Sequence, residues 1–343
     1  MVSVRALLRR YWPKFGGNRN VQLLDGQWDY DFVDGWNSGF DSMSPTFTPA
    51  DATLTKKTAV PSCSDVVAGG APGYLGPRGV AMYKTSFDTL NGRSGGALPV
   101  RLQFQSCSFY CRVFVNNKEV QPPLPEGAEG PGHRAGGYVA FWVDVPAEIL
   151  KSGGANELFV LADNRFNHTT APMHTGGDFW HYGGLTRSVE LHTLAEKDAV
   201  LWRAYVLPTG ADPVDGTTTA PDSIDMTLVL SSPVDGPIDF TVAFDDGTST
   251  DMKGVASKGQ VSLKKLAVPS PKLWSPEEPN LHTVTVSYNG GSVTERFGLR
   301  SFGVDKDSAR ITINGKVTKL VGCAFCAIPS IVYACAILHL SIG

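Results

Sequence analysis

The most restrictive feature of this sequence is its long series of short β-branched or alternating runs, each separated from the next by turn residues. Runs of about four to eight such residues with closely spaced turn signals are typical of an all-β sandwich or barrel. In the first half of the chain these runs are Val100–Phe104, Cys111–Val115, Tyr138–Val143 and Glu157–Leu161. The one helical signal is the short Pro146–Leu150 segment, which has proline at a first-turn position. We therefore predict an all-β fold.

A second series of predicted strands follows a Pro-, Gly-, Thr- and Asp-rich stretch at residues 208–222. Its members are Asp225–Ser231, Ile238–Ala243, Gln260–Leu266, Thr283–Tyr288 and Val293–Phe297. Together they cover roughly 105 residues, the size of an immunoglobulin-like sandwich. Asn289-Gly290-Gly291 is a strong tight-turn signal between the last two strands. We place the boundary between the two series near Thr193–Lys197.

Composition limits the classes of protein that fit. At roughly 150 residues per domain, the 343 residues correspond to about two domains. The chain has 30 Lys and Arg against 33 Asp and Glu, a net charge of −3. Because no basic excess is available to attract a phosphate backbone, we predict no nucleic-acid partner. Six cysteines are too few for a disulfide scaffold of this size.

The N-terminal residues 1–20 are interpreted as a basic lead-in. The apolar run within them is too short for the hydrophobic region of a signal peptide, and Arg5, Arg9 and Arg10 interrupt it. A short basic targeting segment is the alternative interpretation. The compartment stays open, with a soluble cytoplasmic protein favoured.

Six sequence segments, in this order, resemble glycoside hydrolase family 2, which contains β-galactosidases, β-glucuronidases and β-mannosidases. They are LDGQW at 24–28, MYKTSF at 82–87, TGGDFWHYGGLTR at 175–187, LWSPEEPNLHTVTV at 273–286, RFGLRSFGVD at 296–305 and INGKVTKLVG at 313–322. The combination of LWSPEEPNL with RFGLRSF at a short interval is the most specific part. The resemblance covers roughly residues 20 to 322.

The resemblance implies an order of domains. Residues 21–195 correspond to a jelly-roll β-sandwich of the galactose-binding, or sugar-binding, kind, and residues 196–305 to an immunoglobulin-like sandwich. Residues 306–322 resemble the hairpin that leads into the first strand of a (β/α)₈ barrel. Such a barrel takes about 250 residues. We therefore expect a chain that is truncated before the barrel.

The family's chemistry depends on two carboxyl groups about 5–5.5 Å apart, one acting as acid and base and the other as nucleophile. In the family both are glutamates on barrel strands. The last carboxylate of this sequence is Asp307, and Ser308–Gly343 contains neither Asp nor Glu. We therefore expect a fragment of a β-glycosidase that has no catalytic residue, with a carbohydrate as the partner of the intact enzyme. The alternatives are a stand-alone carbohydrate-binding protein and a membrane-tethered β-sandwich protein.

By resemblance, Asp163 and Asn164 are candidate contacts for a substrate hydroxyl in the intact enzyme. Asx residues also cap the turns that follow strands, so a structural role is the competing interpretation. Four further groups receive structural roles. Gly183 and Gly184 are expected to form a positive-φ turn, Arg187 to pair with a carboxylate, Trp180 to pack in the core, and Trp274 to be a structural residue of the LWSPEEPNL motif.

His168, His174, Asp178 and His181 form a loose group, but their spacing matches no zinc pattern. We therefore predict neither a metal site nor a cofactor. Asn167-His168-Thr169 is a glycosylation sequon, which matters only in a secretory compartment.

The last segment, Leu320–Gly343, contains no Asp, Glu, Lys or Arg. A run of about 18 apolar residues suffices for a membrane helix, but Pro329 interrupts this one. Cys323-x-x-Cys326 lacks the βαβ context of a redox motif. We interpret residues 323–343 as an apolar, non-homologous tail, and favour this over a membrane anchor or a short packed element.

Overall fold

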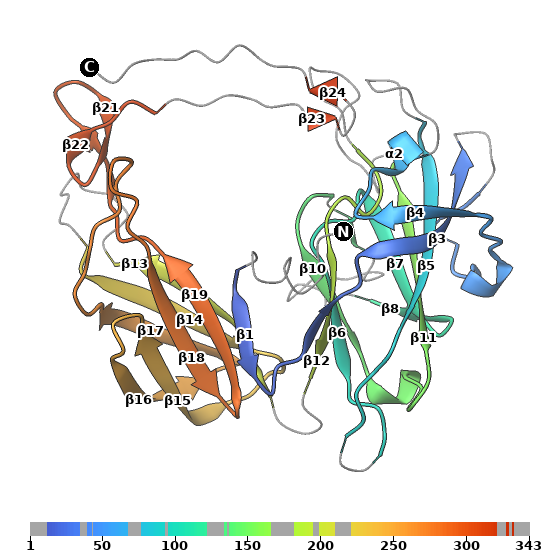
Figure 1. Cartoon of the computed structure of the whole chain (residues 1–343), viewed down its shortest axis with the longest axis horizontal. Coiled ribbons are helices and arrows are strands. Elements are labelled where there is room, and N and C mark those ends of the chain that lie inside the picture. Colours follow the sequence, from blue (N-terminus) through green and yellow to red (C-terminus); the bar gives the residue numbers. More distant parts are fainter. Residues whose placement is uncertain are drawn as a thin grey trace. The chain divides into compact units, whose positions relative to one another are not determined.

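The computed structural model describes twelve stretches of the chain. They are residues 12–34, 40–42, 44–67, 77–92, 95–121, 134–135, 137–165, 182–194, 199–209, 221–320, 327–328 and 331–332. These residues form two compact units, which Figure 1 shows as separate groups of strands. The first sandwich lies within Val21–Glu196, and the second combines residues from Met1–Asn20 with residues from Lys197–Phe325. The prediction of an all-β fold is confirmed, and the described residues contain no (β/α)₈ barrel.

The first sandwich has two sheets. The smaller sheet has the order β10-β6-β12-β2, and the larger has the order β4-β3-β5-β11-β7-β8, with β9 also pairing with β7. The strands are β2 (Val21–Leu23), β3 (Gly26–Asp34), β4 (Lys56–Val60), β5 (Gly79–Phe87), β6 (Val100–Phe104), β7 (Tyr110–Val115), β8 (Lys118–Val120), β9 (Arg134–Ala135), β10 (Phe141–Val145), β11 (Asn156–Asp163) and β12 (Val189–Thr193). Short helical turns lie at η1 (Pro49–Asp51), α2 (Ser64–Val67) and η2 (Ala147–Ile149).

Strand β11 is the central strand of the larger sheet, and its two faces belong to two different clusters. Leu158 and Val160 face the main core, which also contains Trp28 and Tyr83. The alternate residues of β11, such as Phe159, face a smaller cluster on the other side of the sheet. Because successive side chains of a strand point to opposite faces, a strand buried on both sides needs a continuous apolar run. Leu158–Ala162 provides that run.

The second sandwich also has two sheets, with the orders β1-β19-β18-β15-β16 and β13-β14-β17. Its strands are β1 (Lys14–Gly17), β13 (Leu201–Pro208), β14 (Ser223–Leu230), β15 (Gly236–Phe244), β16 (Ser249–Ala256), β17 (Gln260–Ala267), β18 (His282–Tyr288) and β19 (Gly291–Phe297). Strand β14 shows why this unit folds as a sandwich. Ile224, Met226, Leu228 and Leu230 are all buried, while the residues between them are partly exposed.

Two small sheets complete the described structure. One contains β20 (Phe302–Asp305), β21 (Arg310–Ile313) and β22 (Lys316–Val317), and the other contains β23 (Ala327–Ile328) and β24 (Ile331–Val332). Asn314 and Gly315 join β21 to β22 with φ angles of 50° and 77°. Two positive φ angles are what a type I′ hairpin turn requires, as the Asn-Gly sequence predicts.

Several features of the fold differ from the sequence-based expectation. The segment interpreted as a basic lead-in contains strand β1, which pairs with β19. Strand β10 begins at Phe141 rather than at Tyr138, and the expected helical turn at Pro146–Leu150 is the 3₁₀ turn η2. A disulfide joins Cys107 and Cys111, although no disulfide was predicted. Within the described stretches, no helix has the length and apolar character needed to cross a membrane.

Candidate functional site

The candidate sugar-contact residues Asp163 and Asn164 lie where β11 ends. Asp163 is the last residue of the strand and stands opposite Val80 of β5 and Tyr110 of β7. Both side chains are almost fully buried, with exposed fractions of 0% for Asp163 and 1% for Asn164. The site is therefore built around two polar residues that the sandwich encloses.

The Asp163 carboxylate is held by a neighbouring guanidinium. Arg165 Nη2 lies 2.6 Å from Asp163 Oδ2, and the Arg165 backbone N–H donates to Oδ1 at 2.9 Å. Ser42 Oγ donates to the same carboxylate at 2.5 Å. The hydrogen bond from Arg165 to Asp163 raises the pKa of the Arg165 guanidinium. A buried carboxylate is tolerated when it is paired and hydrogen-bonded in this way.

Asn164 joins the end of β11 to the start of β5. Its Oδ1 accepts the Gly79 N–H at 2.8 Å, and its own N–H donates to the Gly79 carbonyl at 3.1 Å. Its Nδ2 donates to Asp65 Oδ1 at 3.1 Å, and its carbonyl accepts from Arg78 Nη1 at 3.1 Å. The Asn164 amide therefore bonds to its neighbours through both its oxygen and its nitrogen.

Asp65, on the short helix α2, is a residue of the candidate site that the sequence did not indicate. It is 2% exposed, and its Oδ1 also accepts the Gly183 N–H at 2.8 Å. Asp65 therefore connects α2, Asn164 and the Gly183-Gly184 segment. No motif in the sequence indicates this role, because its partners lie about a hundred residues away along the chain.

The two glycines are required by close packing. A Cβ atom at Gly183 would lie 2.5 Å from Asn164 Cβ. A Cβ atom at Gly184 would overlap Tyr83 Oη, and Gly184 has a φ of 93°, which side chains rarely adopt. Gly184 also exchanges two backbone hydrogen bonds with Ser108, at 2.9 and 3.0 Å. Gly183 and Gly184 are thus packed against the core with no space for a side chain, and Gly184 forms an antiparallel β-bridge with Ser108.

Burial keeps the titratable neighbours of Asp65 protonated. It raises the pKa of Cys63 to about 11 and that of Tyr138 to about 12, and the Asp65 charge adds to both shifts. The pKa of Tyr83 rises well above its usual value for the same first cause. A general acid or base works best with a pKa near the working pH. These groups are therefore suited to hydrogen bonding rather than to proton transfer.

The remaining predicted residues occupy separate places. Arg187 Nη1 donates to the Tyr138 carbonyl at 3.3 Å, and the expected pairing of Arg187 with a carboxylate stays a prediction. Trp274, in the second sandwich, donates its backbone N–H to the Leu299 carbonyl at 2.8 Å. The Arg300 guanidinium lies 4.7 Å from the centre of the Trp274 ring.

Part of the predicted site lies outside the described residues. This applies to Trp180, to the sequon at Asn167, and to the histidine and aspartate group at 168–181. It also applies to most of the expected tail at 323–343. Where the structure describes the chain, no group of three His, Cys, Asp or Glu side chains is placed to hold a metal ion.

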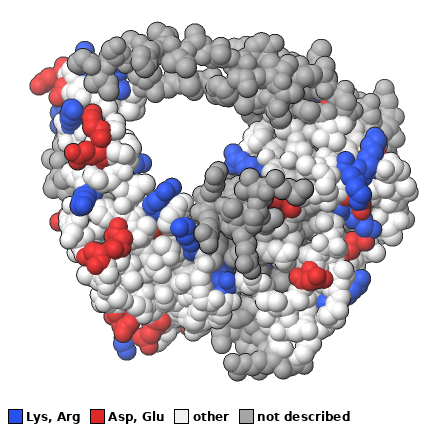
Figure 2. Space-filling model, viewed as in Figure 1, with Lys and Arg blue, Asp and Glu red and all other residues white. Residues whose placement is uncertain are grey.

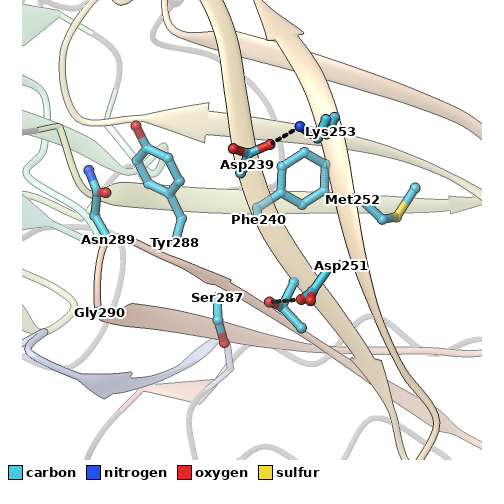
Figure 3. A pocket seen from close by; sticks show the side chains of 10 residues that line it. Asp239, Phe240, Asp251, Met252, Lys253, Ser287, Tyr288, Asn289 and Gly290 are labelled. Atoms are coloured by element: carbon cyan, nitrogen blue, oxygen red, sulfur yellow. Dashed lines mark hydrogen bonds and ion pairs between the residues drawn. The ribbon is translucent and has the colours of Figure 1, made fainter.

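The second sandwich has a polar hollow of about 490 Å³ beside the end of β18 (Figure 3). Tyr288 is the last residue of β18, Asn289 follows it in the turn, and Asp239 comes from β15. Lys253 Nζ, on β16, lies 3.7 Å from Asp239 Oδ1 on β15. On the same two strands, the Thr241 hydroxyl donates to Asp251 Oδ1. Over the face seen in Figure 2, described basic and acidic side chains are interspersed.

The similar proteins found by comparison are glycoside hydrolases. Residues 218–300 match the model of the glycosyl hydrolases family 2. A putative β-glucuronidase of Formosa agariphila is 25% identical over 230 residues, which are 65% of this chain and 25% of that protein. The β-galactosidase BgaC of Bifidobacterium adolescentis is 27% identical over 198 residues, which are 54% of this chain and 18% of that protein. The matched part is thus about a quarter or less of these relatives.

Solved structures show the same fold. A β-glucuronidase from Bifidobacterium dentium, complexed with coumarin-3-O-glucuronide, aligns with a TM-score of 0.64 at 22% identity. The alignment covers 89% of this chain and 52% of that one. A β-galacturonidase from Eisenbergiella tayi aligns with a TM-score of 0.60 at 21% identity, over 87% of this chain and 46% of that one. The chain is therefore similar to a part of the family 2 glycosyl hydrolases.

Proposed function

We propose that this chain supplies the two β-sandwich domains of a family 2 β-glycosidase. Residues 21–195 would form the sugar-binding-like domain, residues 196–305 the immunoglobulin-like domain, and residues 306–322 the hairpin toward a catalytic barrel. The observation that carries the proposal is the family match at residues 218–300, within a chain whose structure aligns over 89% of its length with a β-glucuronidase.

We propose further that these 343 residues do not hydrolyse glycosides by themselves. Retaining hydrolysis needs two carboxyl groups about 5–5.5 Å apart that can reach a substrate. Asp163 is enclosed and paired with Arg165, and Asp65 is buried among backbone N–H and amide donors. Glu277 and Glu278 are exposed on a turn of the second sandwich. None of these carboxylates has the setting of an acid and nucleophile pair.

Direct sugar contact by Asp163 or Asn164 in the intact enzyme stays a prediction. Both side chains are already hydrogen-bonded, so a sugar hydroxyl would have to replace one of the present partners. The same hydrogen bonds are compatible with a structural role for Asp163 and Asn164, in which they position neighbouring residues. Asp163 fixes Arg165 and Asn164 fixes the start of β5, and both hold the end of β11 in place.

The genomic sequence downstream of the Gly322 codon tests the domain assignment. The proposal predicts a coding sequence for a (β/α)₈ barrel with two glutamates at the ends of its strands, joined in frame after Gly322 in at least one transcript. A locus with no such coding sequence would contradict the proposal and favour the alternative below.

The alternative is a stand-alone carbohydrate-binding protein, and the polar hollow beside Tyr288 favours it. Binding sites for small molecules combine an apolar or aromatic wall with a few polar groups that fix orientation. Tyr288 would provide the aromatic wall, and Asp239, Lys253 and Asn289 the polar groups. Calorimetric titration with simple β-glycosides tests this alternative, with Tyr288→Ala as the matched variant. Saturable binding that Tyr288→Ala abolishes would support it, and no heat of binding would exclude it.

A further inference from the structure

The segment Trp12–Asn20 is built into the second sandwich, although about 180 residues separate it from the rest of that unit. Strand β1 pairs antiparallel with β19, from Lys14 opposite Thr294 to Gly17 opposite Gly291. It therefore occupies the edge of the sheet β1-β19-β18-β15-β16 (Figure 1). An uncovered edge strand is a template for pairing with another extended peptide. Here the chain's own N-terminal segment takes that position.

Side chains from the two sides of this contact are stacked on one another. The Arg19 guanidinium lies 4.4 Å from the centre of the Phe15 ring and 5.0 Å from that of Trp202. Arg203 lies 5.2 Å from Phe15 and 4.7 Å from Trp202. Arg19 Nη1 also donates to the Leu201 carbonyl. Cation–π contacts of this kind strengthen when they are shielded from water, and Arg19 is only 6% exposed.

The turn between β18 and β19 is hydrogen-bonded to the end of the Trp12–Asn20 segment. Asn18 donates its backbone N–H to the Gly290 carbonyl at 3.0 Å and its Nδ2 to the Asn289 carbonyl at 2.9 Å. Gly17 has a φ of 67°, and a Cβ atom there would overlap the Gly290 carbonyl oxygen. The contact is therefore specific for a glycine at this position.

We propose that the second sandwich contains a peptide-binding groove whose ligand is residues 12–20 of this chain. The groove consists of the side of β19 that pairs with β1, residues 201–203 and the turn at 289–290. Backbone pairing with a sheet edge supplies affinity in this mode of recognition, and side-chain pockets supply specificity. In this groove, the Phe15 and Arg19 stack and the glycine at position 17 provide the specificity. The inference does not depend on the proposed glycosidase function.

A cleavable full-length chain tests the proposal. A protease recognition sequence is inserted between Asn20 and Val21, the folded protein is cut, and the product is passed over a size-exclusion column. The proposal predicts that the released segment co-elutes with the rest of the chain and is displaced by excess synthetic peptide WPKFGGNRN. With Gly17→Val, retention should fall at least ten-fold. Equal loss of the segment from the unaltered chain and from the Gly17→Val variant would overturn the proposal.

Hydrogen exchange on the uncut chain gives a second test that needs no insertion. Gly17→Val should accelerate amide exchange in Gly291–Phe297 by at least ten-fold, because β19 loses its partner strand. Gly154→Val is the matched control, since Gly154 has no atom within 4 Å of its Cβ position and lies in the first sandwich. Unchanged exchange in β19 of the Gly17→Val protein would overturn the proposal.

Discussion

Glu295 on β19 gives a pH-dependent test of the second sandwich. Burial raises the pKa of its carboxyl from 4.5 to about 7, although the Arg203 charge acts in the opposite direction. At 1.36 kcal/mol per pH unit, a shift from 4.5 to about 7 corresponds to about 3 kcal/mol. Because Glu295 is only partly buried, solvent screening reduces this penalty to about 1–2 kcal/mol.

The direction in which pH changes the free energy of unfolding follows from the protonation states of Glu295. Below pH 4.5 the carboxyl is protonated in both the folded and the unfolded chain, so it imposes no penalty. As the pH rises from 4.5 to about 7, the unfolded chain releases the proton first, and the free energy of unfolding falls. Above about pH 7 the penalty is complete. Glutamine mimics the protonated carboxyl, so Glu295→Gln should stabilise the second sandwich at high pH only.

Urea denaturation at pH 4 and pH 8.5 measures this effect, with hydrogen exchange in Gly291–Phe297 to assign it to the second sandwich. Glu295→Gln should raise the free energy of unfolding by about 1–2 kcal/mol at pH 8.5 and leave it unchanged at pH 4. Glu278→Gln, on an exposed turn, is the control and should have no effect at either pH. A loss of stability in Glu295→Gln at pH 8.5, or an equal gain at both pH values, would refute the reasoning.

Three further predictions concern the first sandwich. Gly184→Ala should destabilise it by more than about 2 kcal/mol, because the new Cβ meets Tyr83 Oη at a positive φ; thermal melting measures this. Asn164→Ala should cost about 2–3 kcal/mol in urea denaturation, since buried hydrogen-bonding groups lose their partner. Replacing both Cys107 and Cys111 by alanine should cost about 2 kcal/mol, the chain-entropy value for so short a loop.

Matched controls make these predictions specific. Gly154→Ala adds a Cβ in open space and should melt like the unaltered chain. Asn91→Ala removes an amide from an exposed loop of the same unit and should cost less than about 0.5 kcal/mol. If a control matched its test variant, the packing and hydrogen-bond arguments would be wrong.

The strands that were predicted from sequence are those with a strong local pattern. ELFVL predicts a strand because both faces of β11 are buried, and the alternation in β14 follows from burial of one face. Strand β1 was missed because its sequence, KFGG, has two glycines and no apolar period. Its stability comes from a partner about 275 residues away, which no local pattern reveals. Strand β16 was missed because it is an exposed edge strand with a polar sequence.

The candidate site was predictable only in part. The sequence places Asp163 and Asn164 directly after a strand, and the structure has them at the end of β11. The Gly183-Gly184 pair predicts a positive-φ turn; Gly184 has a positive φ, but it lies in a β-bridge with Ser108 rather than in an assigned turn. The role of Asp65 follows from contacts between three distant segments, so it appears only once the chain is folded.

The most direct test of the central claim is a turnover measurement on purified residues 1–343. The substrates are the nitrophenyl β-galactoside, β-glucuronide and β-mannoside, and the control is the same purification from host cells without the gene. We predict no hydrolysis above this control, because Asp65 and Asp163 are buried and hydrogen-bonded, and Glu277 and Glu278 lie on an exposed turn, which is not the setting of an acid and nucleophile pair. Hydrolysis that co-purifies with the chain and exceeds the host control would contradict it.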